Sequence, residues 1–372
     1  MWELARVRLQ LFLHRTDLPA HAKKINDVLA AWLPATFCGY PTNLAPVGDH
    51  GTRRMRRTDG RIRHGVVVAD LGDWLSAHLG FNPLTGITTF DWLATPTQAL
   101  AEVTAGAVFH DGLGQLQPVR RLLGWYPDDL RSNLLACQWQ RLSQEEAFVG
   151  RCGEAGDELG SALITARLAR ELMRLCLLMA RRYPPYSMWL GSAFAQLPCA
   201  PQLTPILTAA VTATTWPGRE GHLAAAYETV AALHNTLGLT PPTDPRTRRF
   251  HDRPFRVLHA ERLAVELFAS LTDDAVRALP PIGSIDQYVD STDVLCDRPA
   301  AVLSPRPCSH STSKNTRRTP RTPVPEPEHP DTLTPHPRHS GSRQAENGWC
   351  PVRAATHYDP PLPSVVVGLD AR

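Results

Sequence analysis

Apolar side chains follow a period of two near the start of the chain and helical spacing soon afterwards. Residues 6–13 (RVRLQLFL) carry an apolar side chain at every second position, which predicts a half-buried strand. Residues 21–33 then predict an amphipathic helix. We expect one face of that helix to carry its large apolar side chains, Ile25, Val28, Leu29 and Trp32.

Turn-forming residues divide the next part of the chain into short elements. Residues 34–52 are rich in Pro, Gly, Asn and Asp and predict a long loop, while the Asp-Gly pair at 59–60 predicts the turn of a hairpin. Residues 66–68 (VVV) are a β-branched run of the kind found in buried strands. Residues 72–80 predict a short helix that is closed by its final glycine.

The pattern then becomes mainly helical. Residues 95–105 predict a helix with Thr95 as its N-cap, and residues 107–111 (AVFHD) predict a short strand. Beyond about residue 118 the apolar residues have helical spacing, and the predicted amphipathic helices cover residues 128–150, 160–182, 221–238 and 256–271. Helices of this length would form a bundle.

Residues 299–372 differ in character from the rest of the chain. They hold fourteen of the thirty-four prolines and show no periodicity. Such a segment cannot offset the entropy lost on ordering, so we predict a disordered, proline-rich tail. The short run PSVVVGLD at 363–370 is too isolated from other apolar segments to change that prediction.

Composition argues against several classes of protein. The apolar fraction of 43% suits a soluble globular protein, and no apolar run is long enough to span a membrane. Residues 1–298 carry thirty basic and thirty acidic side chains, so no general basic field favours nucleic acid as a partner. The N-terminus lacks the pattern of a signal peptide. The eight cysteines form no CxxC pair, which predicts reduced thiols and a cytoplasmic protein.

One long stretch carries a family resemblance. Residues 102–198 begin with EVTAGAVFHDGLGQL and include RRYPPYSMWLG at 181–191, and the match continues at 280–295 with PPIGSIDQYVDSTDVL. This part of the chain resembles a bacterial, nucleotidyltransferase-like family known only as domain of unknown function 4037. The resemblance implies an α+β fold in the polymerase-β superfamily. It divides the chain into a truncated α/β domain (1–117), a helical bundle (118–298) and the disordered tail (299–372).

Transferases of that superfamily hold the triphosphate with a Gly-Ser turn, and Mg²⁺ with an Asp-x-Asp pair and a third carboxylate. Residues 1–20 contain neither motif, so the missing segment would lie upstream of Met1. Asp70, at the end of a predicted strand, is the remaining candidate for catalysis; alternatively it faces water. Asp73 is expected to cap the helix that follows. No metal site is predicted, and Mg²⁺ and a nucleoside triphosphate are expected as cofactors only if the chain is active.

Polar and aromatic residues at the ends of two predicted helices are candidates for binding a substrate. Arg151, Asp157 and Glu158 cluster in a glycine-punctuated break, and Tyr183 and Tyr186 follow the second helix. In helical domains that accompany transferases, such residues can face the cleft and hold the acceptor. The alternative is that they cap helices and pack in the core.

Three other groups of residues have simpler interpretations. The arginines between residues 53 and 63 could clamp a phosphate or RNA, but a solvated loop is favoured because no aromatic residues lie between them. Gly283-Ser284, with the aspartates at 286, 290 and 293, imitates the transferase motif without its Asp-x-Asp pair. His64, His110 and His234 lack metal-ligand spacing and are expected to pack or face water.

These observations lead to two hypotheses of function. In the first, the chain descends from enzymes that transfer a nucleotidyl group to a small molecule, and this copy is impaired because the Gly-Ser and Asp-x-Asp motifs are absent. In the second, it is a non-catalytic helical module that binds a ligand or a partner protein. A small-molecule or nucleotide ligand is expected in either case.

Overall fold

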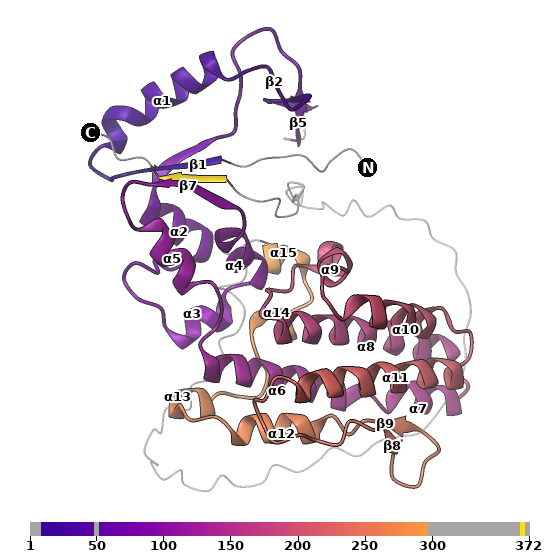
Figure 1. Ribbon diagram of the computed structural model, residues 1–372. Helices are drawn as coiled ribbons and strands as arrows, with labels where there is room; N and C mark the ends of the chain where they lie inside the picture. The colour runs from indigo at the N-terminus through magenta and orange to yellow at the C-terminus, as the bar shows by residue number, and fades with distance from the viewer. Residues whose placement is uncertain (1–8, 48–51, 297–364, 369–372) are drawn as a thin grey trace, which may run out of the picture. The chain divides into compact units, whose positions relative to one another are not determined.

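Four parallel strands form a sheet at one end of the described part of the chain (Figure 1). The structure is a computed structural model that describes residues 9–47, 52–296 and 365–368. The strands of this sheet, in spatial order, are β6 (Val67–Asp70), β1 (Leu9–Leu13), β10 (Val365–Gly368) and β7 (Ala107–Asp111). In the two pairs that β1 forms, Leu11 lies opposite Val68 of β6 and Val367 of β10.

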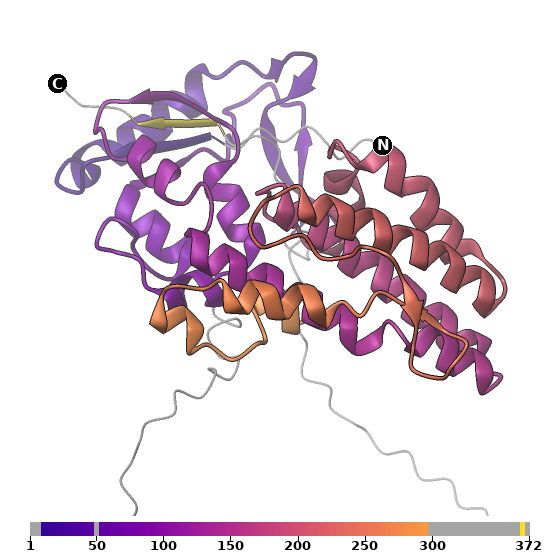
Figure 2. The same cartoon turned by 60° about the horizontal axis from the view of Figure 1, so that its bottom comes forward.

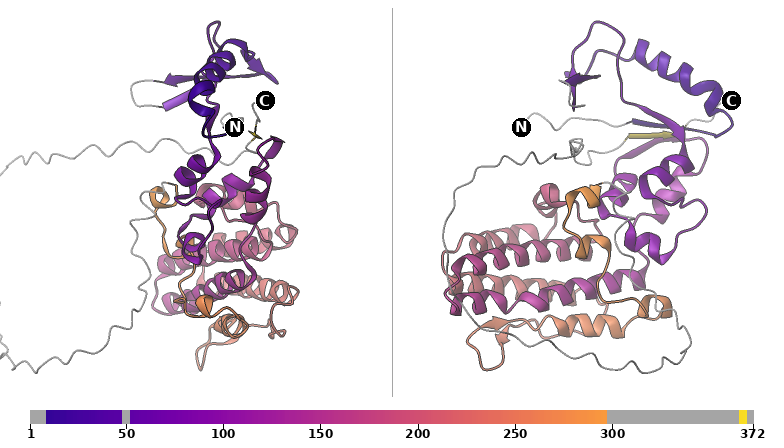
Figure 3. Two further views of the ribbon diagram at one scale, coloured as in Figure 1. Left: turned by 90° about the vertical axis from the view of Figure 1, so that its left-hand side faces the viewer. Right: turned by 180° about the vertical axis from the view of Figure 1, so that it is seen from behind.

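Helices cover both faces of this sheet (Figures 1 and 3). One face carries α1 (Leu18–Trp32), and the other carries α2 (Leu71–Leu79), α3 (Thr89–Ala94), α4 (Thr97–Thr104) and α5 (Leu116–Leu122). The second face holds the apolar core, whose most buried members include Phe12, Leu75, Leu79, Leu100 and Leu123. This core continues into the first bundle helix through Leu130 and Leu134.

The remaining helices form the bundle, with further short helices after it (Figures 1 and 2). The long helices are α6 (Asp128–Glu145), α8 (Glu158–Met179), α10 (Ala200–Thr212), α11 (Trp216–Asn235) and α12 (Glu261–Ala269). The short ones are α7 (Phe148–Glu154), α9 (Ser187–Phe194), α13 (Asp274–Arg277), α14 (Ile285–Tyr288) and α15 (Thr292–Cys296). The fold is therefore mixed, mostly helical with small sheets, and no helix in its described part has the length and apolar character needed to cross a membrane.

Three short antiparallel pairs complete the fold, and two of them correct the predicted loop at 34–52. The pairs are β2 (Thr36–Phe37) with β3 (Tyr40–Pro41), β4 (Asn43–Val47) with β5 (Thr52–Arg56), and β8 (Arg248–Arg249) with β9 (Arg256–Val257). The antiparallel pair here is therefore β4 with β5, and the Asp-Gly pair at 59–60 lies in a bend beyond β5. The reason is that the chain beyond this bend bonds to other elements: Ile62 N–H donates to Ala30 O at 2.8 Å and Leu44 N–H donates to Arg63 O at 2.8 Å.

Two helix predictions also need correction. In α1, Val28 is 48% and Trp32 83% exposed, while Ile25 and Leu29 are half-buried. The side of α1 that packs on the sheet therefore includes Ile25 and Leu29 but not Val28 and Trp32, so only part of the predicted apolar face is buried. The helix predicted to begin at Thr95 begins at Thr97 instead, because Pro96 occupies the N-cap position and Thr95 ends α3.

The segment around residue 366 is not part of a structureless tail. Val365–Gly368 forms β10, which pairs with β1 on one side and β7 on the other. β-branched residues are favoured in strands, so three successive valines suit a strand that is paired on both sides. The prediction failed because the strand's partners are far away in the sequence. The rest of the predicted disordered tail lies outside the described residues.

Residues 283–296, named here the return segment, bring the chain back from the bundle to the helices under the sheet (Figure 1). The segment contains α14 and α15. Its Asp286 side chain is 8% exposed and accepts hydrogen bonds from the backbone N–H and the hydroxyl of Thr97, both at 2.8 Å. The return segment therefore links α4 to the bundle.

Candidate functional site

The carboxyl ends of the parallel strands meet at one edge of the sheet. Asp70 ends β6, Asp111 ends β7, and His14 and Arg15 follow β1. In open α/β sheets, ligands bind outside the carboxyl ends of the strands, where neighbouring connections leave in opposite directions. This edge is therefore the place in the sheet where a ligand is expected.

Asp70 has a structural role at this edge. Its carboxylate accepts the backbone N–H of Asp73 at 3.0 Å and so caps α2. This corrects the prediction that Asp73 is the cap. The capping residue precedes the first turn, because from there its side chain can accept the backbone N–H of the residue three positions further along the chain. Arg15 forms an ion pair with Asp73, and its Nη2 lies 3.9 Å from Asp70 Oδ1. A catalytic role for Asp70 stays a prediction.

The Asp111 carboxylate, like that of Asp70, is hydrogen-bonded to backbone N–H groups. Its carboxylate accepts the N–H groups of Leu116 at 3.3 Å and Gln117 at 2.9 Å, at the start of α5. The strands that carry Asp70 and Asp111 are separated by β1 and β10, which at about 4.8 Å per strand places the two roughly 14 Å apart. Mg²⁺ binds oxygen at about 2.1 Å, so these carboxylates cannot share one ion.

No group of three His, Cys, Asp or Glu side chains able to hold a metal ion occurs in the part of the chain that the structure describes. Instead, the middle of the edge carries Arg15, whose side chain is 68% exposed. The start of α1 lies next to it in the sequence and carries its own acid, Asp17, at the N-cap position. A guanidinium binds phosphate oxygens in pairs, so Arg15 is the side chain at this edge that suits a phosphate.

Arg151, Asp157 and Glu158 lie together where α7 ends and α8 begins. Asp157 caps α8 by accepting the N–H of Gly160 at 2.7 Å. Glu158 forms an ion pair with Arg219, whose side chain is only 6% exposed, and so ties α8 to α11. The Arg151 guanidinium lies 5.3 Å from the centre of the Phe148 ring. Asp157 and Glu158 thus take part in a helix cap and in helix packing, and Arg151 contacts a ring of its own helix. A substrate-binding role for these three residues stays a prediction.

Tyr183 and Tyr186 lie at the opposite end of α8. The Tyr183 hydroxyl donates to Leu123 O at 2.8 Å, and burial raises the pKa of this tyrosine. The Tyr186 side chain is buried, and its hydroxyl oxygen accepts the Trp189 Nε1–H at 3.0 Å. The 22-residue α8 spans about 33 Å. The structure therefore does not bring these tyrosines together with Arg151, Asp157 and Glu158.

Sequence reasoning missed the most extensive polar cluster of the bundle, named here the Glu171 network. Glu171 is 3% exposed. Its carboxylate accepts the Gln138 Nε2–H at 2.7 Å and lies 2.9 Å from Arg170 Nη2, 3.5 Å from Arg141 Nε and 3.9 Å from Arg174 Nη1. Burial would raise the pKa of Glu171, but the arginines, Arg174 foremost, and the Gln138 amide hold it below its ordinary value.

The return segment completes this network. Arg174 Nη1 donates to Asp286 O at 2.8 Å, Gln287 Nε2 donates to Gln138 Oε1 at 3.0 Å, and Arg170 Nη1 lies 2.8 Å from Asp290 Oδ1. Two aspartates of the motif-like stretch after Gly283-Ser284 are thus bonded to protein groups. The signal that could have revealed the network is the run of charged residues inside the otherwise apolar α8.

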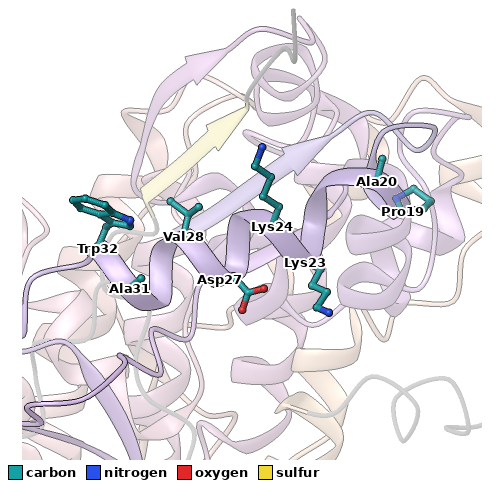
Figure 4. A pocket seen from close by; sticks show the side chains of 8 residues that line it. All are labelled: Pro19, Ala20, Lys23, Lys24, Asp27, Val28, Ala31 and Trp32. Carbon is teal, nitrogen blue, oxygen red and sulfur yellow. The ribbon is translucent and has the colours of Figure 1, made fainter.

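The outer face of α1 is a second exposed feature of the α/β part. A shallow depression follows this face (Figure 4), lined by Pro19, Ala20, Lys23, Lys24, Asp27, Val28, Ala31 and Trp32. Lys24, Val28 and Trp32 project to one side of the helix, and Lys23 and Asp27 to the other (Figure 4). Side-by-side apolar groups at the surface are typical of contact sites.

His234 is buried in the bundle core, 1% exposed, and its Nδ1 accepts the Trp139 Nε1–H at 3.2 Å. Burial, helped by the charge of Arg131, lowers the pKa of His234 to about 4. The unfolded chain therefore binds a proton at higher pH than the folded chain does. We expect stability to be fully present above pH 6.5 and to fall by up to about 3 kcal/mol as the pH drops toward 4.

Replacing His234 by Asn keeps an acceptor for Trp139 and removes the titrating ring. Urea unfolding from pH 4 to 7.5 should therefore show a shallower loss of stability for His234→Asn than for the native chain. His222, which is exposed on the same helix, provides the control, and His222→Asn should keep the native slope. Equal slopes for the native chain and His234→Asn would contradict the assignment.

Comparison with known proteins gives one family match. The model of the family described as "Domain of unknown function (DUF4037)" matches residues 92–190, from α3 to α9. No curated protein matches the chain, and neither does any solved structure. The matched part includes Tyr183, Tyr186 and most of the Glu171 network, whereas Asp70 and β1 lie before it. Over these residues, the chain is similar to a family whose function is unknown.

Proposed function

We propose that the chain is a nucleotidyltransferase-like protein that binds a nucleotide phosphate group at the carboxyl edge of its sheet but does not transfer a nucleotidyl group. The observation that carries this proposal is the arrangement of charge at that edge. The acids Asp70 and Asp111 are on the two outer strands and bond to backbone N–H groups of helices, while the exposed Arg15 follows the strand β1 that lies between them.

Transfer requires a divalent ion that bridges the phosphates and neutralises the charge that develops at the α-phosphorus. Acids roughly 14 Å apart cannot place such an ion. Binding of a phosphate group requires only an accessible cation and no metal ion. The ion pair of Arg15 with Asp73 joins two side chains that are 68% and 60% exposed. Because exposed pairs contribute only about 0–1 kcal/mol, a phosphate can displace Asp73 from the guanidinium.

The test is calorimetric titration of the purified chain with ATP, with and without Mg²⁺. We expect weak binding, with a Kd on the order of 1 mM, that Mg²⁺ does not strengthen. Arg15→Ala should weaken ATP binding about fivefold to tenfold, because one charge-assisted contact is lost. The matched control is Arg61→Ala, since the Arg61 side chain is 65% exposed and pairs with Asp27 on α1. This control should leave ATP binding unchanged.

If ATP bound with a micromolar Kd that depends on Mg²⁺, and pyrophosphate were released, the proposal that the chain does not transfer a nucleotidyl group would be wrong. Equal effects of Arg15→Ala and Arg61→Ala would contradict the position of the site.

The second candidate is a non-catalytic module that binds a partner protein. It is favoured by the exposed outer face of α1, where Trp32 is 83% exposed beside Val28. The ATP titration separates the two candidates, because a chain that binds only protein gives no heat with ATP at any Mg²⁺ concentration.

A further inference from the structure

Two cysteines of the bundle lie side by side although they come from different helices. Cys176 is on α8 and is 2% exposed, and Cys199 is the N-cap residue of α10 and is only partly buried. Their thiols are in hydrogen-bond contact, and Cys199 packs against the core around α8, α10 and α11 that includes Cys176. We propose that Cys176 and Cys199 form a reversible disulfide, in which Cys199 reacts first and Cys176 resolves.

The positions of the two sulfurs give them different roles. Cys199 lies at the start of the 13-residue α10, where the partial positive charge of the helix end stabilises a thiolate. The hydrogen bond with Cys176, followed by a backbone N–H and opposed by burial, lowers the pKa of Cys199 below its ordinary value. The same hydrogen bond and the burial of Cys176 raise the pKa of that thiol, so Cys176 keeps its proton. The reacting thiolate is therefore the more accessible sulfur.

A hydroperoxide can oxidise this pair in two balanced steps. The Cys199 thiolate attacks the outer peroxide oxygen, an S–O bond forms, the O–O bond breaks, and an alcohol or water leaves after protonation. The resulting sulfenic acid is attacked by Cys176, which loses its proton as the S–S bond forms, the S–O bond breaks and water leaves. Two electrons pass from the two thiols to the peroxide.

The disulfide would close a ring around the connection between α8 and α10. This connection carries Tyr183 and Pro184, and the Pro184 carbonyl accepts the Thr97 hydroxyl at 2.6 Å. Oxidation would thus restrain the part of the bundle that contacts α4. The inference stands independently of nucleotide binding.

The first experiment uses the full native chain, reduced and then treated with one equivalent of hydrogen peroxide. Digestion without reductant and mass spectrometry should give a peptide that joins Cys176 to Cys199 and has lost two hydrogens. Because the interaction with Cys176 and the helix end both favour the thiolate of Cys199, iodoacetamide should alkylate Cys199 several-fold faster than Cys152 at pH 7.

Substitutions separate the two roles. Cys199→Ser should abolish the disulfide, and Cys176→Ser should leave a sulfenic acid on Cys199 that dimedone traps. Cys152→Ser changes a partly buried thiol on the neighbouring α7 and should leave the joined peptide unchanged. The inference is overturned if ten equivalents of peroxide give no such peptide in the native chain, or if Cys176→Ser yields no trappable sulfenic acid on Cys199.

Discussion

Replacing Glu171 by Ala should lower the free energy of unfolding by about 3–5 kcal/mol, because it leaves buried arginines without their shared carboxylate. Arg174 is 6% exposed and Arg170 and Arg141 are 24% and 21% exposed, so water can only partly replace Glu171. Glu171→Gln keeps the shape and one acceptor but loses the charge, and its loss of stability should be smaller. Urea unfolding at pH 7 measures both.

The matched control for this prediction is another acid in an ion pair that faces water. The Asp274 side chain is 93% exposed and contacts Arg277 one turn further along α13. Asp274→Ala should leave the unfolding midpoint unchanged. If Glu171→Ala cost no more than this control, the Glu171 network would not contribute to holding α6, α8 and the return segment together.

A chain that ends at residue 364 should lose the centre of its sheet, since β10 is removed. Each ladder hydrogen bond contributes about 1 kcal/mol, so a strand paired on both sides should contribute about 4 kcal/mol or more. Hydrogen exchange should show loss of protection at β1 and β7, while the amides of α8 and α11 keep theirs. A chain that ends at Gly368 retains the strand and is the control.

A point substitution in β10 tests the same position without shortening the chain. Val366→Pro removes one donor from a strand that is bonded on both sides, and the expected cost is about 3 kcal/mol or more. Unchanged exchange at β1 in this variant and in the shortened chain would show that β10 does not belong to the sheet.

Helices and strands whose signals are local were predictable from the sequence. The predicted elements at 72–80, 107–111 and 160–182 correspond to α2, β7 and α8, because apolar spacing and glycine stops act over a few residues. Failures occurred where distant segments decide the outcome. β10 depends on partners more than 250 residues away along the chain, and the exposure of Val28 and Trp32 depends on how α1 packs on the sheet.

The candidate site was harder to predict for a related reason. Polar residues at helix breaks, such as Asp157 and Asp70, attract attention in a sequence, yet in the structure they bond to nearby backbone N–H groups as caps. The Glu171 network joins residues from three separate stretches, and no spacing rule connects Gln138 with Gln287. The proximity of Cys176 and Cys199 was likewise invisible, because it depends on the angle at which α10 returns along α8.

The place of β10 between β1 and β7 also sets a limit on the order of events during synthesis. Leu9 pairs with Val365, so more than 350 residues must leave the ribosome before the strand's two neighbours can be joined. Bringing such distant segments together is slow, whereas the bundle helices contact partners much closer along the chain. We expect nascent chains to acquire a protease-resistant bundle first and a protected N-terminal third only after β10 has left the ribosome.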